Sequence, residues 1–165
     1  MELAQSLASL WSGKMSGELI AFIISLFPVV ELRGGLIISA TVLKLDWWKA
    51  FICCFIGNML PIPFILLFIR KIFELMRKWA PFERIVDSLE RRADKHRDKI
   101  DKYRLWGLFI LVAIPLPGTG AWTGALVAAL MDIRISHALP VIAAGVIVAG
   151  IIVAVLSYGV AGLVG

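Results

Sequence analysis

Residues that build catalytic and metal sites are scarce in this chain. Its 165 residues include two cysteines and two histidines. Cys53 and Cys54 are adjacent, so they do not make a useful disulfide, and a metal site needs more ligands than these two supply. No cluster of carboxylates or histidines stands at metal-ligand spacing elsewhere. We therefore expect no metal, no cofactor and no enzymatic activity, with both cysteines packed as small apolar residues.

Charge is scarce as well. Charged residues make up 18% of the sequence and hydrophobic residues 60%, with a mean hydropathy of +0.89. This composition excludes an ordinary soluble domain and indicates an integral membrane protein with a single bundle of helices. The net charge of +5 does not indicate nucleic acid, because the basic residues cluster between apolar segments. The first 15 residues lack a basic start followed by an apolar run, so we expect no cleavable signal peptide.

The most distinctive stretch is Pro115–Gly124, with the sequence PLPGTGAWTG, which interrupts the apolar segment 105–131. Two prolines and three glycines do not continue a helix comfortably. The apolar flanks, 105–114 and 125–131, would span roughly 10–15 Å as helices, whereas a bilayer core of about 30 Å needs about 20 residues. The segment therefore predicts a re-entrant helical hairpin with its broken backbone facing protein or a wet cavity.

The segment 16–45 is interrupted in the same way. Pro28 and the sequence Glu31-Leu32-Arg33-Gly34-Gly35 divide it, and we expect the break at these charges and glycines. Full transmembrane helices are predicted at 47–69 and 135–164. Pro28 and Pro115 lie 87 residues apart, so each half reads as a hairpin followed by a span. Because one span separates the hairpins, the halves are predicted to be inverted repeats.

The only long polar stretch, 70–104, carries 12 Lys or Arg and 7 Asp or Glu. The positive-inside rule places it in the cytoplasm. An apolar seam from Phe82 to Tyr103 predicts an amphipathic helix, which either lies on the bundle or bilayer surface or forms a dimerising coiled coil. In the re-entrant arrangement both termini face outward. If every apolar segment crossed fully, the termini would share the side of this loop.

Glu31 and Arg33 are the only charges deep inside an apolar segment. A charge in the hydrocarbon costs roughly 2.5–3.5 kcal/mol on insertion scales, so such residues line polar cavities or pair with each other. In a functional interpretation Glu31 titrates protons and Arg33 anchors an anion, since its guanidinium suits carboxylate or phosphate. In the alternative they form a mutually neutralising pair that locks the hairpin.

The second break supplies complementary groups. Its glycines allow close backbone approach, its threonines add hydroxyls, and the half-helix beginning near Ala121 directs free amides at the break, which makes an anion site. Trp122 either walls a ligand or packs, and Asn58 either contacts the ligand or stabilises a kink. The candidate substrate and proton site comprises Glu31, Arg33, Gly34, Gly35, Asn58, Pro115, Pro117, Gly118, Thr119, Gly120, Trp122 and Thr123.

Three motifs carry a family resemblance: ELRGG at 31–35, GNMLPIP at 57–63 and IPLPGTGAWTGAL at 114–126. The chain resembles the small multidrug export proteins, which are distantly similar to the DedA/VTT membrane proteins. The resemblance implies a multi-pass protein of the prokaryotic inner membrane. It also implies re-entrant hairpins that carry acidic and arginine residues, and proton-dependent translocation of lipid carriers.

Together these features predict a small proton-coupled transporter, a homodimer without nucleic-acid partners, that moves an amphipathic or lipid-phosphate anion across the bilayer. Arg33 would repel a cationic drug. The alternatives are an uncoupled flippase or scramblase, a multidrug exporter of cationic compounds, an enzyme acting on lipid phosphates, and a non-transporting scaffold.

Overall fold

The computed structural model describes residues 15–68, 97–116 and 118–164, with side chains placed for 15–68, 103–116 and 118–159. All regular elements in this part of the chain are helices. In order, they are α2 (Gly17–Leu26), α3 (Glu31–Thr41), α4 (Trp47–Met59), α7 (Arg97–Ala113), α8 (Ala121–Leu130) and α9 (Ile135–Val164). Two helices are long and apolar enough to cross a membrane, Trp47–Phe68, which continues α4 past a turn at Leu60, and Ile135–Gly159 within α9. The predicted all-helical fold with two such helices is confirmed for the described residues.

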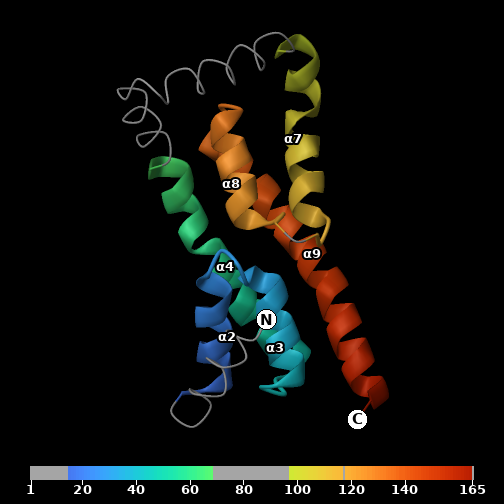
Figure 1. The fold of residues 1–165 in the computed structure, drawn as a ribbon. Helices are drawn as coiled ribbons and strands as arrows, with labels where there is room; N and C mark the ends of the chain where they lie inside the picture. Colours follow the sequence, from blue (N-terminus) through green and yellow to red (C-terminus); the bar gives the residue numbers. More distant parts are fainter. Residues whose placement is uncertain (1–14, 69–96, 117, 165) are drawn as a thin grey trace.

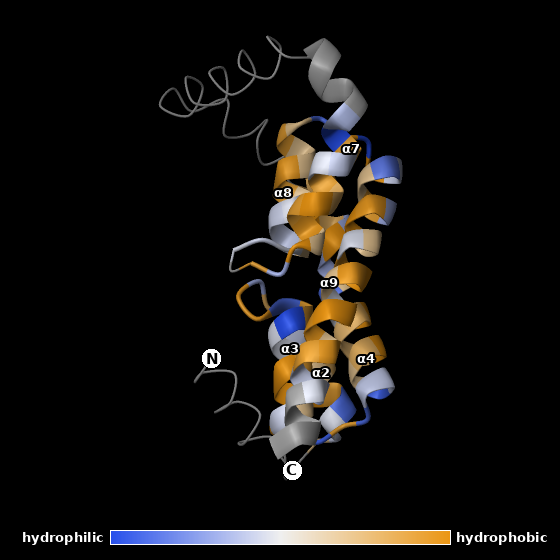
Figure 2. Ribbon diagram, turned by 90° about the vertical axis from the view of Figure 1, so that its right-hand side faces the viewer, coloured by the Kyte–Doolittle hydropathy of each residue, from blue (hydrophilic) through white to orange (hydrophobic). Residues whose placement is uncertain are grey.

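The shorter helices form two hairpins that approach each other from opposite ends of the molecule (Figure 1). In one hairpin α2 and α3 are joined by residues 27–30, and in the other α7 and α8 are joined by residues 114–120. The two turns face each other at mid-height, where the start of α3 is strongly hydrophilic within a largely apolar region (Figure 2). The tips of the hairpins therefore meet in the middle of the molecule.

The first break lies before the charged motif, not within it as the sequence suggested. Helix α2 ends at Leu26 because Phe27 precedes Pro28 and is extended, with ψ 135°. Helix α3 then begins at Glu31 and continues through Gly34 and Gly35 to Thr41. These glycines permit packing: a Cβ on Gly34 would collide with Val30, and one on Gly35 with Ser25 Oγ.

Helix α7 runs without interruption across the boundary predicted at residues 104 and 105. No proline lies near this point, and the chain remains helical through Gly107, from Arg97 to Ala113. Arg104 donates to the carbonyl of Met131, 3.0 Å away, and so stabilises the C-terminal end of α8. Most of the predicted amphipathic helix, residues 70–96, lies outside the described residues.

The first helix of each hairpin packs chiefly on the long helix that follows it in sequence, α2 on α4 and α7 on α9, whereas α3 packs equally on α4 and α9. Glycines allow close approach at corresponding places. A Cβ on Gly57 of α4 would collide with the backbone carbonyl of Phe22 in α2. A Cβ on Gly145 of α9 would lie 2.8 Å from the Cβ of Val112 in α7. The two halves therefore use the same device to seat the first helix of each hairpin against its long helix.

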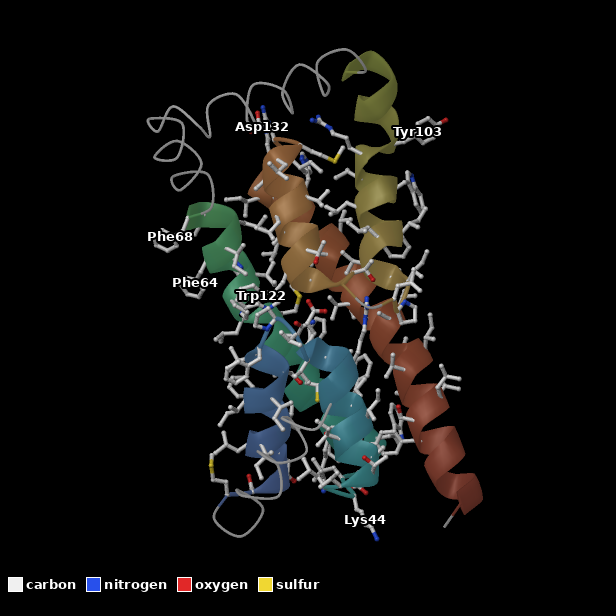
Figure 3. The ribbon with its side chains drawn as sticks, viewed as in Figure 1. Lys44, Phe64, Phe68, Tyr103, Trp122 and Asp132 are labelled. Carbon is white, nitrogen blue, oxygen red and sulfur yellow. The ribbon has the colours of Figure 1, made fainter. Side chains whose placement is uncertain are left out.

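Polar and aromatic residues gather at both ends of this apolar body. Lys44 lies at one end, while Asp132 and Tyr103 lie at the other (Figure 3). Trp47 and Trp48 are exposed just after Lys44, and Tyr103 is 64% exposed beside the equally exposed Trp106. Tryptophan and tyrosine favour the headgroup level of a bilayer, so the two ends have the character of membrane interfaces.

Candidate functional site

Arg33 binds the C-terminal end of α7 across the meeting point of the two hairpins. Its Nη2 atom donates to the carbonyl oxygens of Val112, at 3.0 Å, and Ile114, at 3.1 Å. Its Nη1 atom donates to the Leu116 carbonyl at 2.6 Å and to Thr119 Oγ1 at 3.1 Å. The last carbonyls of a helix have no partner within the helix and carry partial negative charge. The guanidinium therefore stabilises the backbone that the second break leaves open.

Glu31 binds the other helix end at the tip of the second hairpin, the start of α8. Its Oε1 atom accepts a hydrogen bond from the backbone N–H of Trp122, 3.3 Å away, in the first turn of α8. Gly120 is the N-cap residue of α8 and has no side chain to perform this role. The Glu31 carboxylate occupies the space that a Cβ at position 120 would need. A residue of the first hairpin thus supplies the missing cap of a helix in the second.

The backbone at Glu31 is strained. Its φ is 51°, in the left-handed region, which costs an L-residue other than glycine or asparagine about 1–2 kcal/mol. Only 7% of the Glu31 surface is exposed. Strained and buried charged residues persist where the surrounding structure fixes them, and they are concentrated at functional sites.

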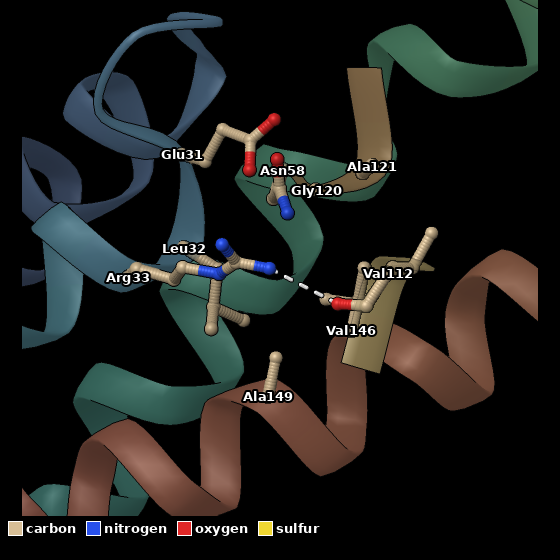
Figure 4. Close-up of a pocket in the computed structure, with 9 residues that line it drawn as sticks. All are labelled: Glu31, Leu32, Arg33, Asn58, Val112, Gly120, Ala121, Val146 and Ala149. Atoms are coloured by element: carbon tan, nitrogen blue, oxygen red, sulfur yellow. Dashed lines mark hydrogen bonds between the residues drawn. The ribbon is translucent and has the colours of Figure 1, made fainter. Parts of the chain in front are cut away.

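A small cavity lies between the hairpin tips and the two long helices (Figure 4). Its volume is about 10 Å³, roughly the space that one water molecule needs. Asn58 contributes from α4; it is 2% exposed, and its Oδ1 atom has no hydrogen-bond partner among the described residues. The lining residues are Glu31, Leu32, Arg33, Asn58, Val112, Gly120, Ala121, Val146 and Ala149.

The geometry bears on two sequence-based expectations about these charges. No salt bridge joins Glu31 and Arg33 directly. Both lie in the first turn of α3, and each pairs with a different helix end of the second hairpin. The first turn of α8 was expected to present its amides to a ligand, but Glu31 accepts the N–H of Trp122 in this structure.

The other predicted site residues that the structure describes divide into three groups. Thr119 and Thr123 close the second break: Thr119 bonds Arg33, and Thr123 donates to the Gly118 carbonyl at 2.9 Å. Pro115 and Gly118 form the turn itself, Gly118 with a φ of 80°. Gly34, Gly35 and Trp122 do not line the cavity, although the indole Nε1 of Trp122 is buried without a hydrogen-bond partner. Pro117 lies outside the described residues.

Some residues of the site carry no signal in the sequence. Val112, Val146 and Ala149 line the cavity, and Leu116 contributes through its backbone carbonyl. They are ordinary apolar residues of a membrane helix or turn. Only the way the helices pack brings them to the site.

No three His, Cys, Asp or Glu side chains in the described ranges are grouped so that they could hold a metal ion. In comparisons with known proteins, the family model described as "Putative small multi-drug export protein" matches residues 31–152. This match covers most of the chain, from the start of α3 through the second hairpin and into α9, and leaves out α2 and the first turn. Neither the curated proteins nor the solved structures gave a match.

Proposed function

Because the chain belongs to the family described as "Putative small multi-drug export protein", we propose that it is a membrane transporter whose gate is the contact between its two hairpin tips. Two contacts support this function. Arg33 binds the carbonyls that end α7, and Glu31 binds an amide that begins α8. Broken helices with charged partners at mid-depth are the usual form of a transporter binding site.

In this proposal the hairpins are re-entrant and the halves are inverted repeats. Helices α2, α3 and α8 have 10, 11 and 10 residues, about 15 Å each, or half of a bilayer core. The hairpin tips expose apolar side chains, with Val29 at 93% and Leu116 at 55%. Apolar tips at mid-height suit a hydrocarbon environment. The basic stretch 70–104 then faces the cytoplasm of a prokaryotic cell.

The proposed substrate is an amphipathic or lipid-phosphate anion, and the proposed coupling ion is the proton. Glu31 as a carboxylate caps α8, whereas a protonated Glu31 would bind the amides less strongly. An anionic group could then take its place beside Arg33 and the start of α8. Proton and anion would bind together. Because the cavity holds about 10 Å³, a headgroup enters only when the tips separate.

A second candidate follows from the family description, which names drug export. All four N–H groups on the terminal nitrogens of Arg33 are directed at acceptors of the second hairpin. The charge of Arg33 is therefore partly offset by helix carbonyls, and a cationic drug could pair with Glu31. In that case drug and proton would compete for the same carboxylate.

Proton movement in proteoliposomes tests the proposal. Wild-type protein should move protons when given lipid phosphates, or cationic drugs in the second candidate, and Glu31→Gln should abolish that movement. Glu18→Gln is the matched control, because Glu18 is the carboxylate in the first turn of α2, away from the tips. Folded wild-type protein that moves protons with neither ligand class would contradict proton coupling. Lipid movement without protons would instead indicate a scramblase.

A further inference from the structure

Asn58 presents an acceptor with no donor. Its side chain lies in the interior, 2% exposed, and its Oδ1 atom has no hydrogen-bond partner among the described residues. Buried polar atoms in folded proteins are almost always bonded, either to protein or to an ordered water. Asn58 lines the cavity at the hairpin tips, beside the two charged residues of the site (Figure 4).

The size and chemistry of the cavity select its occupant. A volume of about 10 Å³ is close to the lower limit for one water molecule and excludes an organic ligand. Glu31 and Arg33 are the only charged residues in the lining. Helices α4, α7, α8 and α9 add Asn58, Gly120 and apolar side chains. A sodium ion is disfavoured, because it would lie close to the guanidinium of Arg33.

The lining offers three partners to a water molecule, the usual number for a buried one. The Glu31 carboxylate and Asn58 Oδ1 can each accept a hydrogen. Arg33 has five N–H groups, and those on Nη1 and Nη2 are directed at Leu116, Thr119, Val112 and Ile114. Its remaining N–H, on Nε, takes part in none of these four bonds.

We propose that this cavity binds one ordered water molecule, which donates to Asn58 Oδ1 and to the Glu31 carboxylate and accepts from Arg33 Nε–H. The water connects the spanning helix α4 to the gate. The role of this water as the immediate proton donor and acceptor of Glu31 rests on the proposed function. The binding of the water rests only on the cavity and the residues that line it. Asn58 is then a positioning residue that acts through the water.

Infrared difference spectra test the water directly. Full-length protein in lipid bilayers is stepped between low and high pH in ordinary water and in water enriched in ¹⁸O. The wild type should show an internal-water O–H band that shifts in H₂¹⁸O. Asn58→Leu should lose this band, and Glu31→Gln should displace or lose it. Ser25→Ala should keep it, because Ser25 also has a buried side-chain oxygen without a hydrogen-bond partner among the described residues but lies outside the cavity.

A wild type with no ¹⁸O-sensitive band would overturn the proposal, and this reading does not depend on any variant folding. An Asn58→Leu protein that keeps the band would also overturn it. So would a band that disappears when sodium replaces choline in the buffer, since the cavity would then take the cation. If the water band is absent but proton coupling is intact, the water site is overturned and the proposed function stands. If the water band is present but no proton flux is seen, the water site stands and the proposed proton coupling is overturned.

Discussion

The carboxylate of Glu31 stands where a side chain at position 120 would have to be, and the residue at 120 is glycine. The first hairpin thus caps α8 in place of the N-cap residue itself. Each of the following predictions tests a part of this interlocked arrangement or of the membrane topology around it.

Gly120→Ala should displace Glu31 from the start of α8. The new methyl group would collide with the carboxylate, and the φ of 158° adds strain for an L-residue. We expect a lower melting temperature and loss of Glu31-dependent proton flux. Gly118→Ala is the matched control, because its φ of 80° is also unfavourable but nothing lies within 4 Å of its Cβ. Equal loss of flux in both variants would contradict the specific role of Gly120.

Arg33→Lys should destabilise the protein although it keeps the charge. A lysine has three donors and no planar fork, so it does not reach all four acceptors that Arg33 binds. Hydrogen bonds to charged groups contribute about 1.5–3 kcal/mol each, so the loss should exceed about 2 kcal/mol. Thermal unfolding in detergent measures it. Lys49→Gln, which breaks an exposed ion pair with Asp46, should change stability very little; an effect as large as that of Arg33→Lys would be unexpected.

Gly57→Ala should prevent α2 from seating on α4. The added methyl would meet the backbone carbonyl of Phe22, which has no freedom to move aside without moving the helix. Overpacking of this kind costs about 1–3 kcal/mol. The yield of monodisperse protein and its melting temperature should both fall. Gly107→Ala, whose Cβ meets nothing within 4 Å, should be tolerated, and similar damage in both would show that the close approach is not the cause.

Cysteine labelling should place both ends of the first hairpin on one side of the membrane. Gly17 begins α2 and Lys44 follows α3 at the same end of the molecule. In a background without Cys53 and Cys54, Ser16→Cys and Lys44→Cys should react with an impermeant maleimide from the same side. Arg134→Cys should react from the other. Labelling of Ser16 and Lys44 from opposite sides would mean that the first segment crosses fully.

The sign of the pH effect on ligand binding should identify the substrate class. If the substrate is an anion that replaces Glu31 at α8, its affinity should rise as pH falls, by at most about tenfold per pH unit for one proton. Glu31→Gln should bind the anion with little pH dependence. A cationic ligand should show the opposite slope in the wild type, because it competes with the proton. Titration of binding at several pH values distinguishes the two.

Composition and the positions of proline and glycine were enough to predict the helical elements. Pro28, together with Pro115 and the glycines after it, marks the two breaks, because proline and glycine act on the backbone within a few residues. The exact start of α3 was not predictable in this way. The glycines at 34 and 35 resemble helix breakers. They instead leave room for neighbouring side chains, Gly34 for Val30 at the start of α3 and Gly35 for Ser25 in α2.

The identity of the two key charges was also predictable, but their partners were not. A carboxylate and a guanidinium inside an apolar segment must be compensated, so Glu31 and Arg33 stand out in the sequence. Apart from Thr119 Oγ1, their partners are backbone groups more than 75 residues away. Backbone carbonyls and amides carry no residue-specific signal, so only the packing of one hairpin against the other reveals them.

The interlock at the hairpin tips is one-sided: both charged side chains come from the first hairpin and both open helix ends belong to the second. The halves are alike in layout, yet neither could stand in for the other. Two copies of the first half would bring together four charged side chains without the end of α7 and the start of α8 that bind them here. The present protein should therefore tolerate substitutions at matching positions of its two halves very unequally. An ancestor assembled from two identical halves would have needed another way to join its hairpin tips.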